Sequence, residues 1–116
     1  IPGELSRWAP RSFDVVVSSA TLMYISPDDV DATLLACLRL AKRGMVLCEP
    51  TVEPRTASVE GDIAGGYVQW SHSYIDRLET LLQTQFAGDV RWELRCERKS
   101  HELCNAMTTV RLQWQR

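Results

Sequence analysis

The chain has 116 residues, of which 45% are hydrophobic and 24% are charged, and its formal net charge is −2 with both signs scattered along the sequence. This balance is typical of a globular domain and excludes an intrinsically disordered chain, and the lack of a basic cluster argues against binding to nucleic acid or to an anionic membrane. We therefore expect a single domain, residues 1–116, whose partners are small molecules or proteins.

The sequence opens with a connecting segment and a strongly apolar strand. Residues 1–12 contain Pro2 and Pro10, which exclude a helix through the segment, so an extended connection is expected. Phe13 then begins the run FDVVV, which shows no regular polar alternation. A continuous β-branched run is typical of a strand covered on both faces, and residues 13–17 are therefore predicted to be a central strand of a parallel sheet.

A helix and a second strand follow. Ser26 is the expected cap of the helix, Pro27 occupies its first position, and apolar residues then recur at three- and four-residue spacing. Gly44 is expected to end the helix after a cationic last turn, and residues 45–48 form a short second strand. A strand, a helix and a strand in this order predict a right-handed parallel pair.

The wording of residues 13–50 resembles a known family. The run FDVVVSS, the segment LMYIS, the next helix, and the strand that ends in Glu49 and Pro50 resemble the second half of the Rossmann-like fold of class I S-adenosylmethionine-dependent methyltransferases. Members of that family hold the cofactor chiefly through a glycine-rich loop and an acidic residue that precede the segment corresponding to Phe13. Residues 1–12 contain neither feature. The resemblance therefore implies the C-terminal portion of such an enzyme, inactive by itself.

The middle of the chain is predicted to be a long loop and a second helix. Residues 51–69 have no apolar period, so we expect a loop that either covers a ligand site or is a disordered insertion. Ser71 or Ser73 is the expected cap of the helix that follows, and Gly88 is its expected stop.

Two strands are expected to close the chain. Residues 90–96 alternate between apolar and polar side chains, as in a half-exposed strand, and residues 107–114 form a last strand. The predicted fold class is α/β, a partial Rossmann-like methyltransferase fold in the order β-α-β-α-β-β, with a mostly parallel sheet and an antiparallel last strand. Its single domain would consist of a core at 13–50, a loop at 51–69, and a helix with two strands at 70–116.

The resemblance also assigns a cofactor site. Ligands of doubly wound sheets bind beyond the carboxyl ends of the strands, which places the end of the first strand beside S-adenosylmethionine. The resemblance implies that Ser18, Ser19, Ala20 and Thr21 line the methionine half of this cofactor and that Tyr24 lies near its sulfonium. The alternative is that the serines only terminate the strand, with their hydroxyls hydrogen-bonded.

Four further residues are candidates on the acceptor side. Glu49 ends the second strand at the same edge, and it would orient the acceptor or serve as a base; a structural cap is the open alternative. His72 lies between Trp70 and Tyr74 at a helix start, where related small-molecule methyltransferases often carry aromatic residues and histidines. His72 is therefore the second catalytic candidate and the two aromatic residues are substrate-binding candidates, while a structural histidine is the alternative.

The four cysteines bear on the compartment. They form no C-x-x-C pair and have no histidine at ligand spacing, so we expect reduced thiols in a cytoplasmic protein rather than a zinc or disulfide framework. No apolar run approaches the roughly 18 residues that a membrane span needs.

Two functions stay open at this point. The first is the C-terminal portion of a methyltransferase for a small-molecule acceptor, with cofactor binding weak or absent until the missing N-terminal half is supplied. The second is a non-enzymatic half-fold domain that pairs with itself or a partner through an exposed sheet edge. Because the strand at residues 13–17 has no expected neighbour on one side within the chain, a homo-oligomer is predicted for the isolated chain.

Overall fold

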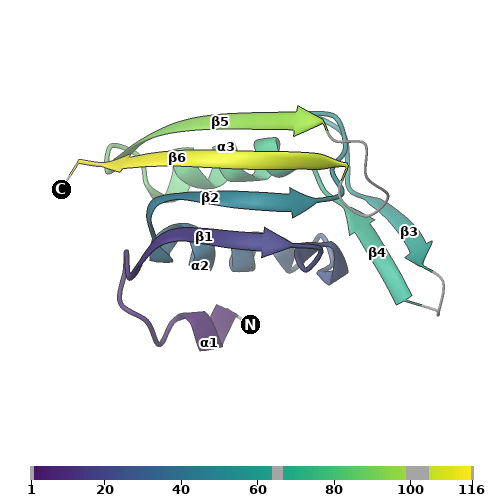
Figure 1. The fold of residues 1–116 in the computed structure, drawn as a ribbon, viewed down its shortest axis with the longest axis horizontal. Helices are drawn as coiled ribbons and strands as arrows, with labels where there is room; N and C mark the ends of the chain where they lie inside the picture. The colour runs from purple at the N-terminus through teal and green to yellow at the C-terminus, as the bar shows by residue number, and fades with distance from the viewer. Residues whose placement is uncertain (1, 64–66, 99–104, 116) are drawn as a thin grey trace.

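The computed structural model describes residues 2–63, 67–98 and 105–115. Figure 1 shows the main sheet with helices behind it and a hairpin at one end. The elements are α1 (Pro2–Leu5), β1 (Phe13–Ser19), the short 3-10 helix η1 (Leu22–Tyr24), α2 (Val30–Leu40), β2 (Ala41–Glu49), β3 (Val59–Ile63), β4 (Tyr67–Ser71), α3 (Tyr74–Gln85), β5 (Val90–Arg98) and β6 (Ala106–Trp114).

The main sheet is mixed. Its strand order is β1-β2-β6-β5, and β3 pairs with β4 in a separate sheet. β1 and β2 are parallel, whereas β6 runs antiparallel to both of its neighbours, β2 and β5. The expected antiparallel last strand is thus present, but the expectation of a mostly parallel sheet is wrong. β6 is inserted between β2 and β5 and is antiparallel to both, so two of the three strand pairings are antiparallel although β5 runs in the same direction as β2.

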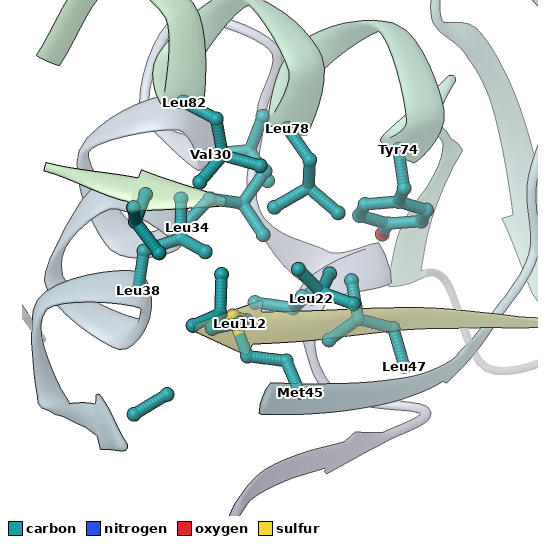
Figure 2. Close-up of a cluster of buried hydrophobic side chains, with 13 residues drawn as sticks. Leu22, Val30, Leu34, Leu38, Met45, Leu47, Tyr74, Leu78, Leu82 and Leu112 are labelled. Atoms are coloured by element: carbon teal, nitrogen blue, oxygen red, sulfur yellow. The ribbon is translucent and has the colours of Figure 1, made fainter. Parts of the chain in front are cut away.

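The hydrophobic core lies between one face of the main sheet and the helices α2 and α3. Figure 2 shows Leu34 of α2 and Leu78 of α3 in one cluster with Met45 and Leu47 of β2. Each of these four side chains is at most 1% exposed. Since full burial of a side chain of this size contributes about 1.5–3 kcal/mol, this cluster is what holds both helices on the sheet.

β1 is an edge strand with an exposed apolar side. Val15 and Val17 are 48% and 65% exposed, whereas Val16 between them packs against the core. The expectation of a central strand covered on both faces is therefore wrong. Among the described elements, no helix covers the face that carries Val15 and Val17, and no strand pairs with the outer side of β1. The apolar residues of this run therefore lie partly on the surface of the chain and partly in its core.

Two segments expected to be irregular contain regular structure. Pro2–Leu5 forms a short helix within the expected extended connection, because proline is tolerated in the first turn of a helix. The expected loop at 51–69 contains β3 and most of β4, which pair antiparallel with Val59 opposite Ser71. The sequence carries little strand signal here because Glu60, Gly61 and Asp62 interrupt the apolar residues of β3.

Gly44 belongs to a strand and does not end a helix. α2 ends at Leu40 and β2 begins at Ala41, so the strand follows the helix directly. A Cβ atom built on Gly44 would lie 2.1 Å from the carbonyl oxygen of Val110. Glycine is therefore required here because the backbones of β2 and β6 approach closely. Gly88, with φ of 79°, follows the end of α3 as predicted.

The two main helices begin in different ways. α2 starts at Val30 and not at Pro27, after a turn in which the amides of Asp29 and Val30 both donate to the carbonyl of Ser26. Ser73, one of the two serines predicted as caps, is the N-cap of α3, and its hydroxyl donates to the Asp76 carboxylate at 2.8 Å. In the described part of the chain, no helix is both long and apolar enough to cross a membrane.

Candidate functional site

A cavity of about 240 Å³ lies beside the carboxyl end of β1. Three of the residues expected to contact a cofactor line it, namely Ser18, Ser19 and Thr21, together with apolar side chains from α1, α2, β1 and β2. The other two expected residues do not line this cavity. Ala20 lies in the loop that follows β1, and the Tyr24 side chain is 51% exposed.

The wall of this cavity is formed in part by the segment that we call the η1 loop, residues 20–25. Ala20 at its start has a left-handed backbone, with φ of 50°, and its amide donates to the carbonyl of Cys48 on β2 at 3.0 Å. A left-handed conformation is unfavourable for a residue with a Cβ atom. The surrounding contacts must therefore hold the loop in this shape.

Glu49 supplies the largest share of those contacts. Its side chain is 1% exposed and accepts from three donors. The Ser18 hydroxyl donates to Oε2 at 2.6 Å, the Thr21 amide donates to both carboxylate oxygens at 3.1 Å, and the Met23 amide donates to Oε1 at 3.1 Å. A buried carboxylate needs such donors to offset its loss of hydration. Both carboxylate oxygens of Glu49 therefore accept hydrogen bonds from main-chain amides of the η1 loop.

His72 holds the other end of the loop. Its ring is fully buried, with Nε2 2.8 Å from the carbonyl oxygen of Ile25 and Nδ1 2.7 Å from the hydroxyl of Ser58. Because a carbonyl only accepts hydrogen bonds, Nε2 carries the proton, and Nδ1 accepts from Ser58. Both ring nitrogens are thus engaged inside the protein in the neutral form of the ring.

The surroundings of His72 favour that neutral form. Burial holds the pKa of His72 below its ordinary value of 6.5, the hydrogen bond to Ile25 acts in the opposite direction, and the nearby Arg77 guanidinium lowers the pKa further. Asp31 has a smaller raising effect. The result is a histidine that stays uncharged at neutral pH.

Arg77 extends the network to the helices. Its guanidinium donates to the Ser58 hydroxyl at 3.1 Å and forms a 2.9 Å ion pair with Asp31 of α2. The main chain is joined at the same place, since the Thr51 hydroxyl donates to the carbonyl of His72 at 2.6 Å. The polar network therefore ties α2, α3, the hairpin and the η1 loop together.

The aromatic candidates surround His72. The Trp70 ring stacks on the His72 ring with centroids 6.4 Å apart and planes 11° apart, and the Tyr74 ring meets it edge-on at 5.6 Å. Tyr74 is fully buried and belongs to the core cluster in Figure 2. Trp70 is partly exposed. The structure thus brings His72, Trp70 and Tyr74 together, but it places only Trp70 where solvent reaches it.

Sequence reasoning missed Ser58 and Arg77. Ser58 lies in the segment interpreted as a loop, and Arg77 lies on a helix face where a cation is ordinary. No local signal connects them with His72, because the three residues meet only through the fold. Among the described residues there is no group of three side chains suited to holding a metal ion.

No family model and no curated protein matches the sequence. Solved structures match it. The chain aligns over 92% of its length with 47% of the 1,6-didemethyltoxoflavin-N1-methyltransferase of Burkholderia thailandensis, determined with 1,6-didemethyltoxoflavin and S-adenosylhomocysteine bound, at a TM-score of 0.58 and 14% identity. It aligns over 92% of its length with 62% of a SAM-dependent methyltransferase from Methanosarcina mazei, at a TM-score of 0.52 and 10% identity.

The chain thus spans about half the length of the Burkholderia protein and less than two thirds of the Methanosarcina protein. At these identities the likeness concerns the fold. The chain has the fold of part of a SAM-dependent methyltransferase.

Proposed function

We propose that this chain is the C-terminal portion of a SAM-dependent methyltransferase that acts on a small molecule. The observation that carries the proposal is the convergence of Ser18, Ser19 and Thr21 on one cavity at the carboxyl end of the parallel pair β1–β2. That is the edge at which α/β sheets bind their ligands. The fold likeness supports the choice of cofactor, since the Burkholderia structure has both 1,6-didemethyltoxoflavin and S-adenosylhomocysteine bound.

The residues present fit one part of the cofactor. The hydroxyl oxygens of Ser19 and Thr21 can accept hydrogen bonds from the ammonium group at its amino-acid end, and the apolar lining suits its carbon chain. A volume of about 240 Å³ lies below the roughly 300–1,000 Å³ of complete small-molecule sites. The cofactor, when bound, supplies an activated methyl group. We therefore expect weak binding by this chain alone, and the remaining wall comes from another segment.

We place the acceptor on the side of the β3–β4 hairpin, which extends beyond the carboxyl ends of β1 and β2 (Figure 1). Trp70 is the candidate contact, while buried Tyr74 supports the wall from inside. Methyl transfer depends mainly on placing the acceptor in line with the methyl group. Glu49 and His72 have all their polar side-chain atoms engaged, so this proposal gives them positioning roles in place of acid–base chemistry.

Calorimetry and a methylation assay test the proposal. The chain alone should show no saturable binding of S-adenosylhomocysteine below about 1 mM. Fused behind a first half that carries a glycine-rich loop, it should bind in the micromolar range and transfer methyl groups. Thr21→Val should then weaken binding, whereas Thr80→Val, an exposed threonine on α3, should not. A folded fusion that binds no cofactor would contradict the proposal.

One observation favours a second function, self-pairing through the edge of β1. Antiparallel pairing of two copies about Val16 would set Val15 opposite the partner's Val17 and cover valines that are now exposed. Sedimentation at micromolar concentration should then show a dimer, Val17→Lys a folded monomer, and Val59→Lys, on the hairpin, a dimer still. A compact wild-type monomer with cooperative unfolding would exclude this function.

A further inference from the structure

We propose that Glu49 and His72 are positioning residues that hold the η1 loop by its two ends and so fix one wall of the ligand cavity. The identity of the ligand rests on the proposed function. The contacts that carry the inference are independent of that identity.

The η1 loop contributes directly to the cavity. Thr21, Leu22 and Ile25 all line it, next to Ser18 and Ser19 at the end of β1. A shift of the loop would therefore change the shape of the cavity and the direction of the Thr21 hydroxyl. Ligand sites require their contacting groups to be held within about 0.5 Å of the productive geometry.

The η1 loop has few contacts of its own that hold it in place. Ala20 is left-handed, and the single turn of η1 has no side-chain cap at Thr21. Short 3-10 turns have weaker hydrogen-bond geometry than α-helices. The first amides of such a turn need acceptors, and Glu49 provides them for Thr21 and Met23.

Glu49 and His72, which hold the two ends of the loop, both lie at or next to the ends of strands. Glu49 is the last residue of β2 and is paired with Ala106, the first residue of β6. His72 follows β4, and its ring is fixed by Ser58 on one nitrogen and by the Ile25 carbonyl on the other. The loop is thus tied at its start to the main sheet and at its end to the base of the hairpin.

The consequence for function is specific. Neither side chain has a free atom to take a proton from an acceptor, so their loss should weaken ligand binding through disorder of the loop. At the sequence level a role toward the acceptor and a structural role were both open for each residue, and the hydrogen bonds favour the structural role.

Nuclear magnetic resonance on the isotope-labelled chain tests the inference. In the wild type, through-hydrogen-bond coupling should link the amide nitrogens of Thr21 and Met23 to the side-chain carboxyl carbon of Glu49, a signature that needs no variant. Glu49→Gln should speed hydrogen exchange at these two amides by about tenfold or more. Exchange at Val110 in the sheet should stay within about twofold. Glu79→Gln, exposed on α3, is the matched control and should change neither amide.

His72→Ala tests the other end of the loop. It should broaden or shift the Ile25 and Tyr24 resonances and leave the strand resonances in place. The inference would be overturned if the wild type showed no hydrogen-bond coupling to Glu49. It would also be overturned if amide exchange at Thr21 and Met23 were unchanged in Glu49→Gln. Both readouts are independent of any ligand.

The same variants connect the inference to the ligand. With S-adenosylhomocysteine at millimolar concentration, the wild type should show chemical-shift changes at Ser18, Ser19 and Thr21. The Glu49→Gln variant should bind the same ligand at least about tenfold more weakly. If Glu49→Gln speeds amide exchange in the loop but neither the wild type nor the variant binds the ligand, the proposed function fails and the positioning role stands. If the ligand binds the wild type and Glu49→Gln equally, the positioning role fails.

Discussion

Replacing Gly44 by alanine is a stringent test of the packing of β2 against β6. The new Cβ would lie 2.1 Å from the carbonyl oxygen of Val110, and side-chain carbons essentially never approach within 3.0 Å of a heavy atom. The obstacle is backbone in a paired strand, so no side-chain rotation relieves it. The strands would have to separate by about 1 Å, which lengthens the main-chain hydrogen bonds between β2 and β6.

The cost follows from that geometry. Overpacking typically costs about 1–3 kcal/mol, and a clash with fixed backbone belongs at the top of this range or above it. For a domain of this size a loss of about 3 kcal/mol lowers the melting temperature by roughly 12 °C. Circular dichroism during thermal and urea unfolding measures both quantities. Gly61→Ala is the matched control, because its Cβ would meet only an oxygen at 3.9 Å. A Gly44→Ala protein as stable as Gly61→Ala would refute the reasoning.

Further predictions concern the buried network and the core. Because the pKa of His72 is held below 6.5 in the folded chain, the unfolded chain binds this proton more readily; the stability that the neutral ring contributes is present above pH 6.5 and is lost as the pH falls toward the folded pKa. The melting temperature should drop between about pH 7.5 and pH 5.5, and His72→Gln should reduce that drop; an equal drop in both proteins would contradict the assignment. Ser58→Ala leaves Nδ1 of His72 buried without its donor and should cost about 1–3 kcal/mol in urea unfolding; a loss near zero would mean that the hydrogen bond is unimportant. Leu34→Ala, at a fully buried position, should cost about 2–5 kcal/mol in the same assay, and a cost typical of a surface residue would show that α2 does not pack as described.

Much of the architecture was predictable from local pattern. The periodicity of α3, its Ser73 cap and Gly88 stop, and the strand residues near both ends of the chain depend on neighbours in sequence, and these predictions agree with the structure. The wrong predictions arise where one local sequence pattern is compatible with two different structures. The FDVVV run is apolar both where it faces the core and where it is exposed, and the sequence does not distinguish a covered face from an uncovered one. Gly44 fits a helix end and a close strand contact equally well.

The contacts of the candidate site could not be predicted from the sequence. The resemblance implied that Ser18, Ser19 and Thr21 lie beside a ligand at the carboxyl end of a strand, and the structure shows that they line one cavity. The hydrogen bonds of Glu49 and His72 are not local, since each joins residues 14 to 47 positions apart. Only the fold brings those groups together, which is why a structural alternative stayed open for both residues at the sequence level.

The measurement that tests the central claim most directly is a titration of the isotope-labelled chain with S-adenosylhomocysteine, followed residue by residue by nuclear magnetic resonance. We predict concentration-dependent shifts confined to Ser18, Ser19 and the η1 loop, without saturation below about 1 mM, and none from a matched titration with buffer alone. Shifts that are absent at the highest soluble ligand concentration, or that map to the β5–β6 surface instead, would contradict the assignment of this edge as part of a cofactor site.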